Sequence, residues 1–203
     1  MKLVIMTKST FFVEEDKILA ALFEQGLDNL HLYKPGSSPM YAERLLTLLP
    51  DDFYKNITVH DHFYLQQEYG LAGIHLDNAD TPLPIGYKGR VGRTCHRLDE
   101  LKEMKRNSNY VFLDHTFGPS ATGSEALPPY TPDELEAAAD SGLIDKKVYA
   151  MGGLTLDNIR TAKQLGFGGV VVSDDIWSKF DIHSQDDYKE VINHFIRIKK
   201  TVS

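Results

Sequence analysis

The sequence predicts an α/β fold, a single (βα)8 TIM barrel over residues 1–203, from three features of its pattern. Eight short apolar and β-branched runs alternate with helical patterns, and this alternation is typical of a parallel sheet. Eight strands close such a sheet into a barrel, and 203 residues lie near the lower limit of about 200 for that fold. No segment has the composition of a linker, so we expect one domain. The alternative fold is an open, doubly wound sheet.

The expected strands follow one another at regular intervals along the chain. They are Leu3–Thr7, Leu30–Tyr33, Ile57–His60, Gly73–Leu76, Arg90–Thr94, Tyr110–Leu113, Val148–Met151 and Gly169–Ser173.

The expected helices have apolar residues on one face and recognisable residues at their ends. They are Glu14–Gln25, a segment that starts at Ser38-Pro39, Asp99–Lys105, a segment that starts at Thr131-Pro132, Leu156–Leu165 and Asp187–Lys200. Ser and Thr are good N-caps, Pro suits the first helical position, and Gly26 and Gly166 suit the ends. The connection after the fourth strand holds Pro82, Pro84, Gly86 and Gly89, so its helix must be short or missing.

Composition narrows the classes of partner. The 22 basic and 29 acidic side chains give a net charge of −7, which argues against a nucleic-acid partner because that needs a basic face. One Cys excludes a disulfide framework and suits a reducing compartment. No apolar run approaches the roughly 20 residues of a membrane span, so we expect a cytoplasmic protein that binds no membrane.

Polar residues gather where the expected strands end. In a parallel barrel the carboxyl ends of the strands form the functional face. Six of the eight histidines fall there, at positions 31, 60, 62, 75, 96 and 115. Any single one of them also fits a packing role at the rim.

The turns after strands seven and eight predict a phosphate site. Gly152-Gly153 follows strand seven and precedes a helix start, and glycines let backbone N–H groups approach an anion closely. Ser173 follows strand eight, before a short extra helix that extends through Trp177. In barrels these two loops often form one phosphate site. Taken by itself, Gly-Gly also fits a simple tight turn.

Three further features could carry chemistry. His115 follows strand six, and an imidazole near its free pKa of about 6.5 can take and return a proton at neutral pH. Asp61 and Asp80 end neighbouring strands and could hold Mg²⁺, or could be solvated loop acids. His60 and His62 share a spacing used for zinc, without a clear third ligand.

Seven short motifs in a fixed order carry a family resemblance. They are His31-Leu32-Tyr33-Lys34, Thr58-Val59-His60-Asp61-His62, Gly73-Ile74-His75-Leu76, Gly92-Arg93-Thr94-Cys95-His96, Asp114-His115-Thr116-Phe117, Met151-Gly152-Gly153-Leu154-Thr155 and Val172-Ser173. In this order the chain resembles the thiamine phosphate synthase/TenI superfamily of (βα)8 barrels. The resemblance implies that a small phosphorylated thiazole is the ligand, held at its phosphate by Gly152, Gly153 and Ser173. It implies that His31, Lys34, His60 and Thr94 bind the rest of the substrate.

The superfamily holds two activities. Synthases join a pyrimidine diphosphate to thiazole phosphate with Mg²⁺, whereas TenI-like tautomerases move protons on a thiazole carboxylate phosphate and need no cofactor. Synthases carry Gln-x-Arg-x-Lys where this chain has His31-x-Tyr33-Lys34, and a lid lysine where it has none between Gly118 and Tyr130. Asp114-His115-Thr116-Phe117 resembles the Gly-His-x-Phe element of the tautomerases.

The first hypothesis from the sequence is therefore a thiazole tautomerase of thiamine biosynthesis, with His115 as the acid–base residue. One alternative is thiamine phosphate synthase, with Asp61 and Asp80 on Mg²⁺. Another is a non-catalytic protein that binds thiazole or thiamine phosphate. Each is compatible with a homo-oligomer.

Overall fold

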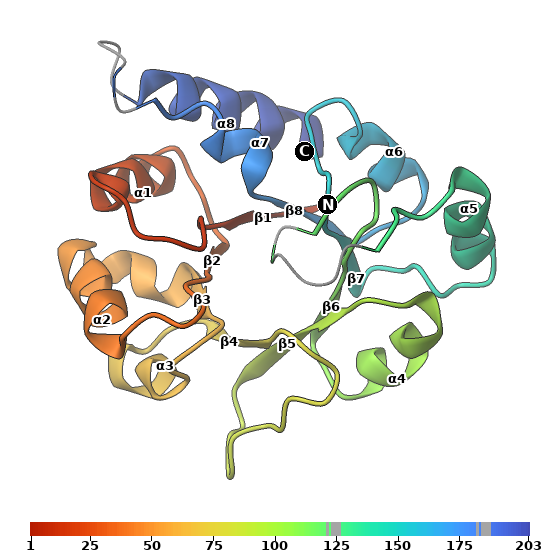
Figure 1. The fold of residues 1–203 in the computed structure, drawn as a ribbon, viewed down its shortest axis with the longest axis horizontal. Coiled ribbons are helices and arrows are strands. Elements are labelled where there is room, and N and C mark those ends of the chain that lie inside the picture. The colour runs from red at the N-terminus through yellow and green to blue at the C-terminus, as the bar shows by residue number, and fades with distance from the viewer. Residues whose placement is uncertain (121, 123–126, 182, 184–187) are drawn as a thin grey trace.

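The computed structural model describes residues 1–120, 122, 127–181, 183 and 188–203. Its strands form an inner ring with the helices outside (Figure 1). In chain order the elements are β1 Lys2–Met6, α1 Glu15–Glu24, β2 Leu30–Leu32, α2 Pro39–Leu48, η1 Asp51–Asn56, β3 Ile57–Val59, α3 Tyr64–Tyr69, β4 Gly73–Leu76, β5 Arg90–Cys95, η2 Leu98–Glu100, α4 Leu101–Arg106, β6 Tyr110–Leu113, α5 Pro132–Asp140, β7 Val148–Ala150, α6 Ile159–Gln164, β8 Gly169–Val172, α7 Asp174–Trp177 and α8 Lys189–Val202.

The sheet is a closed barrel of eight parallel strands in sequence order. Closure is made by β1 against β8, where Lys2 pairs with Gly169 and Ile5 pairs with Val172. Every strand therefore has two neighbours, and no edge is left to aggregate. The predicted (βα)8 barrel is confirmed, and the open sheet is excluded.

Side chains that alternate along each strand face either the helices or the barrel lumen. On β1, Leu3 and Ile5 join the large apolar core between strands and helices, whereas Val4 and Met6 join a second buried cluster. This second cluster also contains Tyr110, Phe112 and Val171, from strands around the ring. It fills the lumen, so the barrel is a packed core and not a pore.

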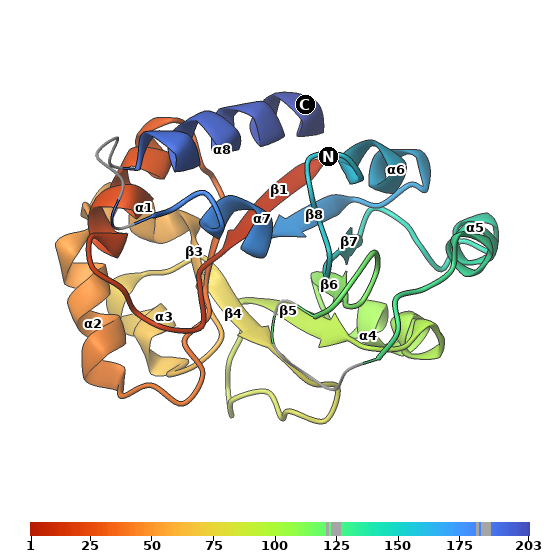
Figure 2. The same cartoon turned by 45° about the horizontal axis from the view of Figure 1, so that its top comes forward.

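The outer layer closes over the first strand. Helix α8 packs over β1 between α1 and α6 (Figure 2). The short helix α7 is tied to the barrel because the indole Nε1–H of Trp177 donates to the Met6 carbonyl at 2.7 Å. This bond fixes the loop after β8, where Ser173 lies.

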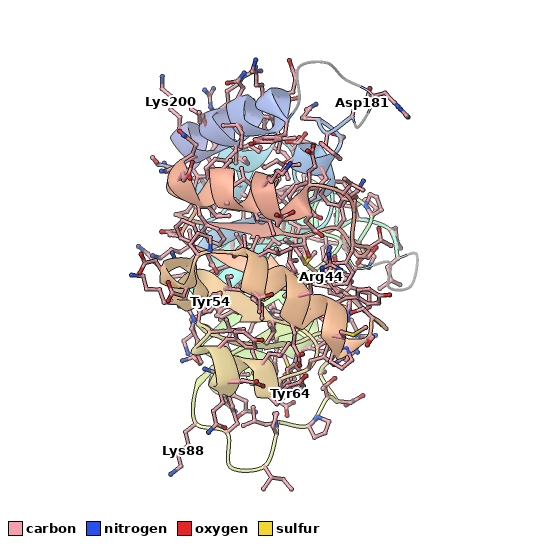
Figure 3. All side chains as sticks on the ribbon, turned by 90° about the vertical axis from the view of Figure 1, so that its left-hand side faces the viewer. Arg44, Tyr54, Tyr64, Lys88, Asp181 and Lys200 are labelled. Atoms are coloured by element: carbon pink, nitrogen blue, oxygen red, sulfur yellow. The ribbon has the colours of Figure 1, made fainter. Side chains whose placement is uncertain are left out.

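The connection from β4 to β5 has no helix, as the sequence predicts. It leaves the barrel as an extended loop with Lys88 near its far end (Figure 3). The guanidinium of Arg93 holds its first half by donating to the carbonyls of Ala79 and Thr81 at 3.1 and 3.0 Å.

Three local predictions differ from the structure. Ser38 is the N-cap of α2, but its side chain makes no capping hydrogen bond. Helix α6 begins at Ile159 rather than Leu156, because the Asn158 side chain accepts from the Thr155 N–H at 2.9 Å and holds a turn there. Helix α3 has no clear apolar period and was not predicted. By contrast, Thr131 caps α5 as expected, and it forms a capping box with Glu134.

None of the helices described in the structure has both the length and the apolar character that a membrane crossing requires.

Candidate functional site

The loops after β7 and β8 converge on one cavity. Gly152, Gly153 and Ser173 all line it, together with Pro119, Leu154, Thr155, Val171, Asp174, Asp175 and Ser178, and its volume is about 350 Å³. The three residues predicted to bind phosphate are therefore brought together. Asp175 also belongs to the wall, and its carboxylate lies 2.6 Å from His194 Nε2.

The two glycines are needed for a reason that the sequence did not reveal. Both have left-handed backbone, with φ of +86° at Gly152 and +66° at Gly153. A Cβ on Gly152 would lie 2.7 Å from the backbone nitrogen of His115, and one on Gly153 would lie 2.5 Å from Cα of Gly118. The loop after β6 thus rests directly on the glycine turn.

Backbone hydrogen bonds join these two loops. The N–H of Thr116 donates to the Met151 carbonyl at 2.9 Å, and the N–H of Phe117 donates to the Gly152 carbonyl at 3.0 Å. The position of His115 is consequently set by the same turn that lines the predicted phosphate cavity.

His115 is buried and its backbone is left-handed, with φ of +57°. Neither of its ring nitrogens has a hydrogen-bond partner among the described residues. Burying polar atoms without partners costs free energy, so such a group is typical of a functional position. His115 also lines a second cavity of about 420 Å³, with His96, Tyr130 and Pro128.

Asp114 organises the surroundings of His115. Its carboxylate lies 3.5 Å from His96 Nδ1, and it accepts from the Ser120 hydroxyl at 2.5 Å and from the His115 N–H at 2.9 Å. Burial acts to raise the pKa of Asp114, but these hydrogen bonds outweigh it and leave that pKa below its ordinary value. The same bond to Asp114 raises the pKa of His96.

The loop that carries Ser120 follows β6 and includes the segment between Gly118 and Tyr130 that has no lysine. Residues 121 and 123–126 of this segment lie outside the described residues. Thr122 contacts the segment after β2, where the Tyr33 hydroxyl donates to the Thr122 carbonyl at 2.9 Å.

His31, His60 and Thr94 lie in the upper part of the lumen, where His75 joins them. His31 Nδ1 lies 2.8 Å from His60 Nε2, and His75 Nε2 lies 2.9 Å from the Thr94 hydroxyl. Burial lowers the pKa of His31 and of His75 well below the ordinary value, so both rings are neutral at neutral pH. Three of the predicted substrate residues thus lie near His75, but His31 and His60 bond to each other and Thr94 bonds to His75.

Lys34, the fourth predicted substrate residue, is paired with a carboxylate on α1. Its ammonium is 2% exposed and donates to Glu15 Oε1 at 2.6 Å and to the Thr10 carbonyl at 2.9 Å. It also lies 4.6 Å from the centre of the Phe11 ring. Its role toward a substrate stays a prediction, because the structure pairs it with α1.

Of the two predicted metal ligands, Asp61 is half-buried and Asp80 is exposed. Burial raises the pKa of Asp61, and the charge of Asp77 adds to this. Asp61 Oδ2 has no hydrogen-bond partner among the described residues. The carboxylate coupled to Asp61 is therefore Asp77, which no feature of the sequence favours over Asp80. His62 shares with His60 a spacing used for zinc, but His62 Nε2 lies 2.9 Å from the Ser37 carbonyl and not beside His60 Nε2.

Comparison with known proteins identifies the family. A sequence model described as thiamine monophosphate synthase matches residues 46–176, which is more than half of the chain. The chain belongs to this family. The predicted resemblance is thereby confirmed.

Solved structures of this family are similar over nearly the whole chain. The crystal structure of thiamine phosphate pyrophosphorylase from Bacteroides thetaiotaomicron is 46% identical, with a TM-score of 0.87 over 99% of this chain and 97% of that one. Thiamine phosphate pyrophosphorylase from Pyrococcus furiosus is 17% identical with a TM-score of 0.74, covering 100% and 97% of the two chains. At that lower identity the likeness shows the fold alone.

Curated relatives are more distant. The thiamine-phosphate synthase of Flavobacterium johnsoniae is 26% identical over 140 residues, 63% of this chain and 64% of the relative, so the match spans less than two thirds of that protein. The thiamine-phosphate synthase of Shouchella clausii is 23% identical over 175 residues, 82% of each chain. These names favour the synthase alternative over the tautomerase that was our first hypothesis.

Proposed function

We propose that this chain is a transferase, a thiamine phosphate synthase, that joins a thiazole phosphate to a pyrimidine diphosphate with release of diphosphate. What supports this most is the 46% identity to a thiamine phosphate pyrophosphorylase, which extends over 97% or more of both chains. The tautomerase becomes the second candidate.

The thiazole phosphate would bind in the cavity of Gly152, Gly153 and Ser173. Left-handed glycines expose backbone N–H groups, and a serine hydroxyl adds a donor. A cavity of about 350 Å³ lies in the size range of pockets for small ligands. The ring would then extend toward the barrel axis and the loop of His115, which rests on the same turn.

Mg²⁺ is implied for a synthase, and the acidic residues at the mouth fit it. Asp61 offers a buried oxygen without a partner among the described residues, and Asp77 lies near enough to raise the pKa of Asp61. Carboxylate oxygens are the ligands that Mg²⁺ takes in proteins. We infer that Asp61 and Asp77 would hold the ion, with Asp80 as a further ligand on the same loop. When bound, the ion would neutralise the charge of the diphosphate.

The second candidate, the tautomerase, is favoured by one specific observation. His115 is buried, its backbone is left-handed, and both ring nitrogens lack hydrogen-bond partners among the described residues, with Asp114 Oδ2 3.8 Å from Nε2. Such a group is free to exchange a proton with a bound thiazole. No cofactor would be needed.

The test supplies the purified protein with thiazole phosphate, hydroxymethylpyrimidine diphosphate and Mg²⁺, and measures thiamine phosphate. A parallel reaction supplies the exocyclic thiazole tautomer alone. Formation of thiamine phosphate supports the synthase. Conversion of the tautomer without thiamine phosphate overturns the synthase in favour of the second candidate. If neither reaction occurs, the synthase and the tautomerase proposals are both wrong, and the non-catalytic binding protein is the hypothesis that stands.

A binding measurement tests the phosphate cavity separately. Ser173→Ala should weaken thiazole phosphate binding by about tenfold or more, because a hydrogen bond to a charged group contributes about 1.5–3 kcal/mol. Ser141→Ala is the matched control, since that hydroxyl only bonds the Ala138 carbonyl at the end of α5. Equal affinities of the two variants, by calorimetry, would remove Ser173 from the site.

A further inference from the structure

Three histidines from consecutive strands and their ends meet in the barrel lumen. They are His31 on β2, His60 just after β3 and His75 on β4. One nitrogen from each ring lies within 4.8 Å of one nitrogen of each of the other two. All three residues are 3% exposed or less. His31 and His60 were predicted to bind substrate, but the proposed function assigns no step to the cluster, and the inference below does not rest on that function.

Hydrogen bonds account for five of the six ring nitrogens. His31 Nδ1 faces His60 Nε2 at 2.8 Å, His31 Nε2 faces the Tyr110 hydroxyl at 3.3 Å, and His60 Nδ1 faces Asp77 Oδ1 at 2.6 Å. His75 Nε2 faces the Thr94 hydroxyl at 2.9 Å. His75 Nδ1 is buried and has no partner among the described residues.

The roles in this network follow from the carboxylate, which can only accept. His60 therefore donates from Nδ1 to Asp77, which leaves a lone pair on His60 Nε2 pointed at His31. A histidine fixed by a carboxylate in this way is the usual arrangement around a metal ion, where the outer partner sets the tautomer and makes the ligand nitrogen more basic.

We propose that His31, His60 and His75 form a binding site for a divalent transition-metal ion of the zinc class, with Asp77 and Thr94 as outer partners. Imidazole nitrogen suits Zn²⁺, Co²⁺ and Ni²⁺, whereas Mg²⁺ prefers oxygen. The ligand set of this site is therefore chemically distinct from that of the proposed Mg²⁺ site, although Asp77 lies next to both. Three protein ligands also leave one position for water or another ligand.

Binding requires the three imidazole rings to move. With bonds of about 2.0–2.1 Å, two nitrogens of a tetrahedral site lie about 3.3 Å apart, so the 2.8 Å separation of His31 and His60 must open by about half an ångström. His31 passes its proton from Nδ1 to Nε2, which then donates to the Tyr110 oxygen. The His75 ring must tilt from its stacked position between His60 and Phe112, where its centre lies 4.4 and 4.3 Å from theirs.

The experiment titrates the full-length protein, first treated with a chelator, with Co²⁺ alone and with Zn²⁺ alone. We expect one equivalent of Co²⁺ to bind with the visible absorption of a four-coordinate ion, and Zn²⁺ to displace it. We also expect the melting temperature to rise with metal concentration, because the ion binds only the folded chain. If no absorption and no rise in melting temperature occur, the network is only hydrogen-bonded and the proposal is wrong.

Variants locate the ion. His60→Gln and His75→Gln should each weaken binding by more than the roughly 10–100-fold that loss of an outer partner costs, and Asp77→Asn should weaken it within that range. His62→Gln is the matched control, since this ring lies two residues from His60 but bonds to Ser37. Its affinity should equal that of the wild type.

A second group of side chains offers the competing explanation. His96, Asp114 and His115 also place ligand atoms within 4.8 Å of one another. Loss of Co²⁺ absorption in His115→Gln, with retention in His75→Gln, would assign the ion to that group and overturn the proposal. Thiazole phosphate binding by His75→Gln should stay unchanged, so a failed metal titration is distinguished from failure of the proposed function.

Discussion

Replacing Gly152 with alanine tests whether the glycine turn holds the loop of His115. The added Cβ would lie 2.7 Å from the His115 nitrogen, 3.0 Å from its Cα and 3.1 Å from Asp114 Oδ1. Two of these atoms are backbone and cannot move aside without shifting the loop. The shift would strain the hydrogen bonds from Thr116 and Phe117 to the turn.

The expected loss of stability in Gly152→Ala has two parts. An alanine in left-handed backbone costs about 1–2 kcal/mol. Overpacking in a tight region adds about 1–3 kcal/mol. Gly166→Ala isolates the first part, because Gly166 has the same φ of +86° as Gly152 and nothing within 4 Å of its added Cβ.

The assay is urea unfolding of both variants and the wild type, with thermal melting as a second measure. Gly166→Ala should lose about 1–2 kcal/mol, and Gly152→Ala about 1–3 kcal/mol more. Each kcal/mol corresponds to about 2–4 °C for a domain of this size. Equal losses in the two variants would refute the close contact between the turn and His115. Gly152→Ala should also bind thiazole phosphate more weakly than Gly166→Ala.

Three further predictions concern stability. Lys34→Met should lower the free energy of unfolding in urea by about 3–5 kcal/mol, because it leaves the Glu15 carboxylate buried without its cation. The double variant Lys34→Met/Glu15→Leu should lose less stability than Lys34→Met alone. Thr131→Ala should cost about 1 kcal/mol by loss of the N-cap of α5, and a change below a few tenths would contradict the capping box. The wild type should be more stable than His96→Gln, by an amount that is greatest near pH 5 and smaller by about pH 8. The pKa of His96 is raised in the folded chain, so protonated His96 stabilises the fold below its ordinary pKa of about 6.5. That stabilisation is lost as the pH rises through the pKa of His96 in the folded chain. A difference in stability that is constant with pH would show that the His96–Asp114 pair carries no charge effect.

The strand order and the position of the predicted phosphate cavity could be read from the chain. The eight runs alternate with helical patterns, and each runs in the same direction, so all their carboxyl ends reach one face. Gly152, Gly153 and Ser173 follow the last two strands, which are neighbours in any closed barrel. Pro82 and Pro84 likewise excluded a regular helix after β4 whatever the packing.

Which side chains meet inside the barrel was decided by the tertiary structure. The stagger between neighbouring strands places His31, His60 and His75 at one level of the lumen, and no spacing along the chain encodes that level. Lys34 finds Glu15 on a helix, and Asp61 is coupled to Asp77 rather than to Asp80. The chain thus determined the elements and their order, because these depend on local periodicity and capping. Contacts between polar side chains depend on register and closure, which exist only once all eight strands are paired.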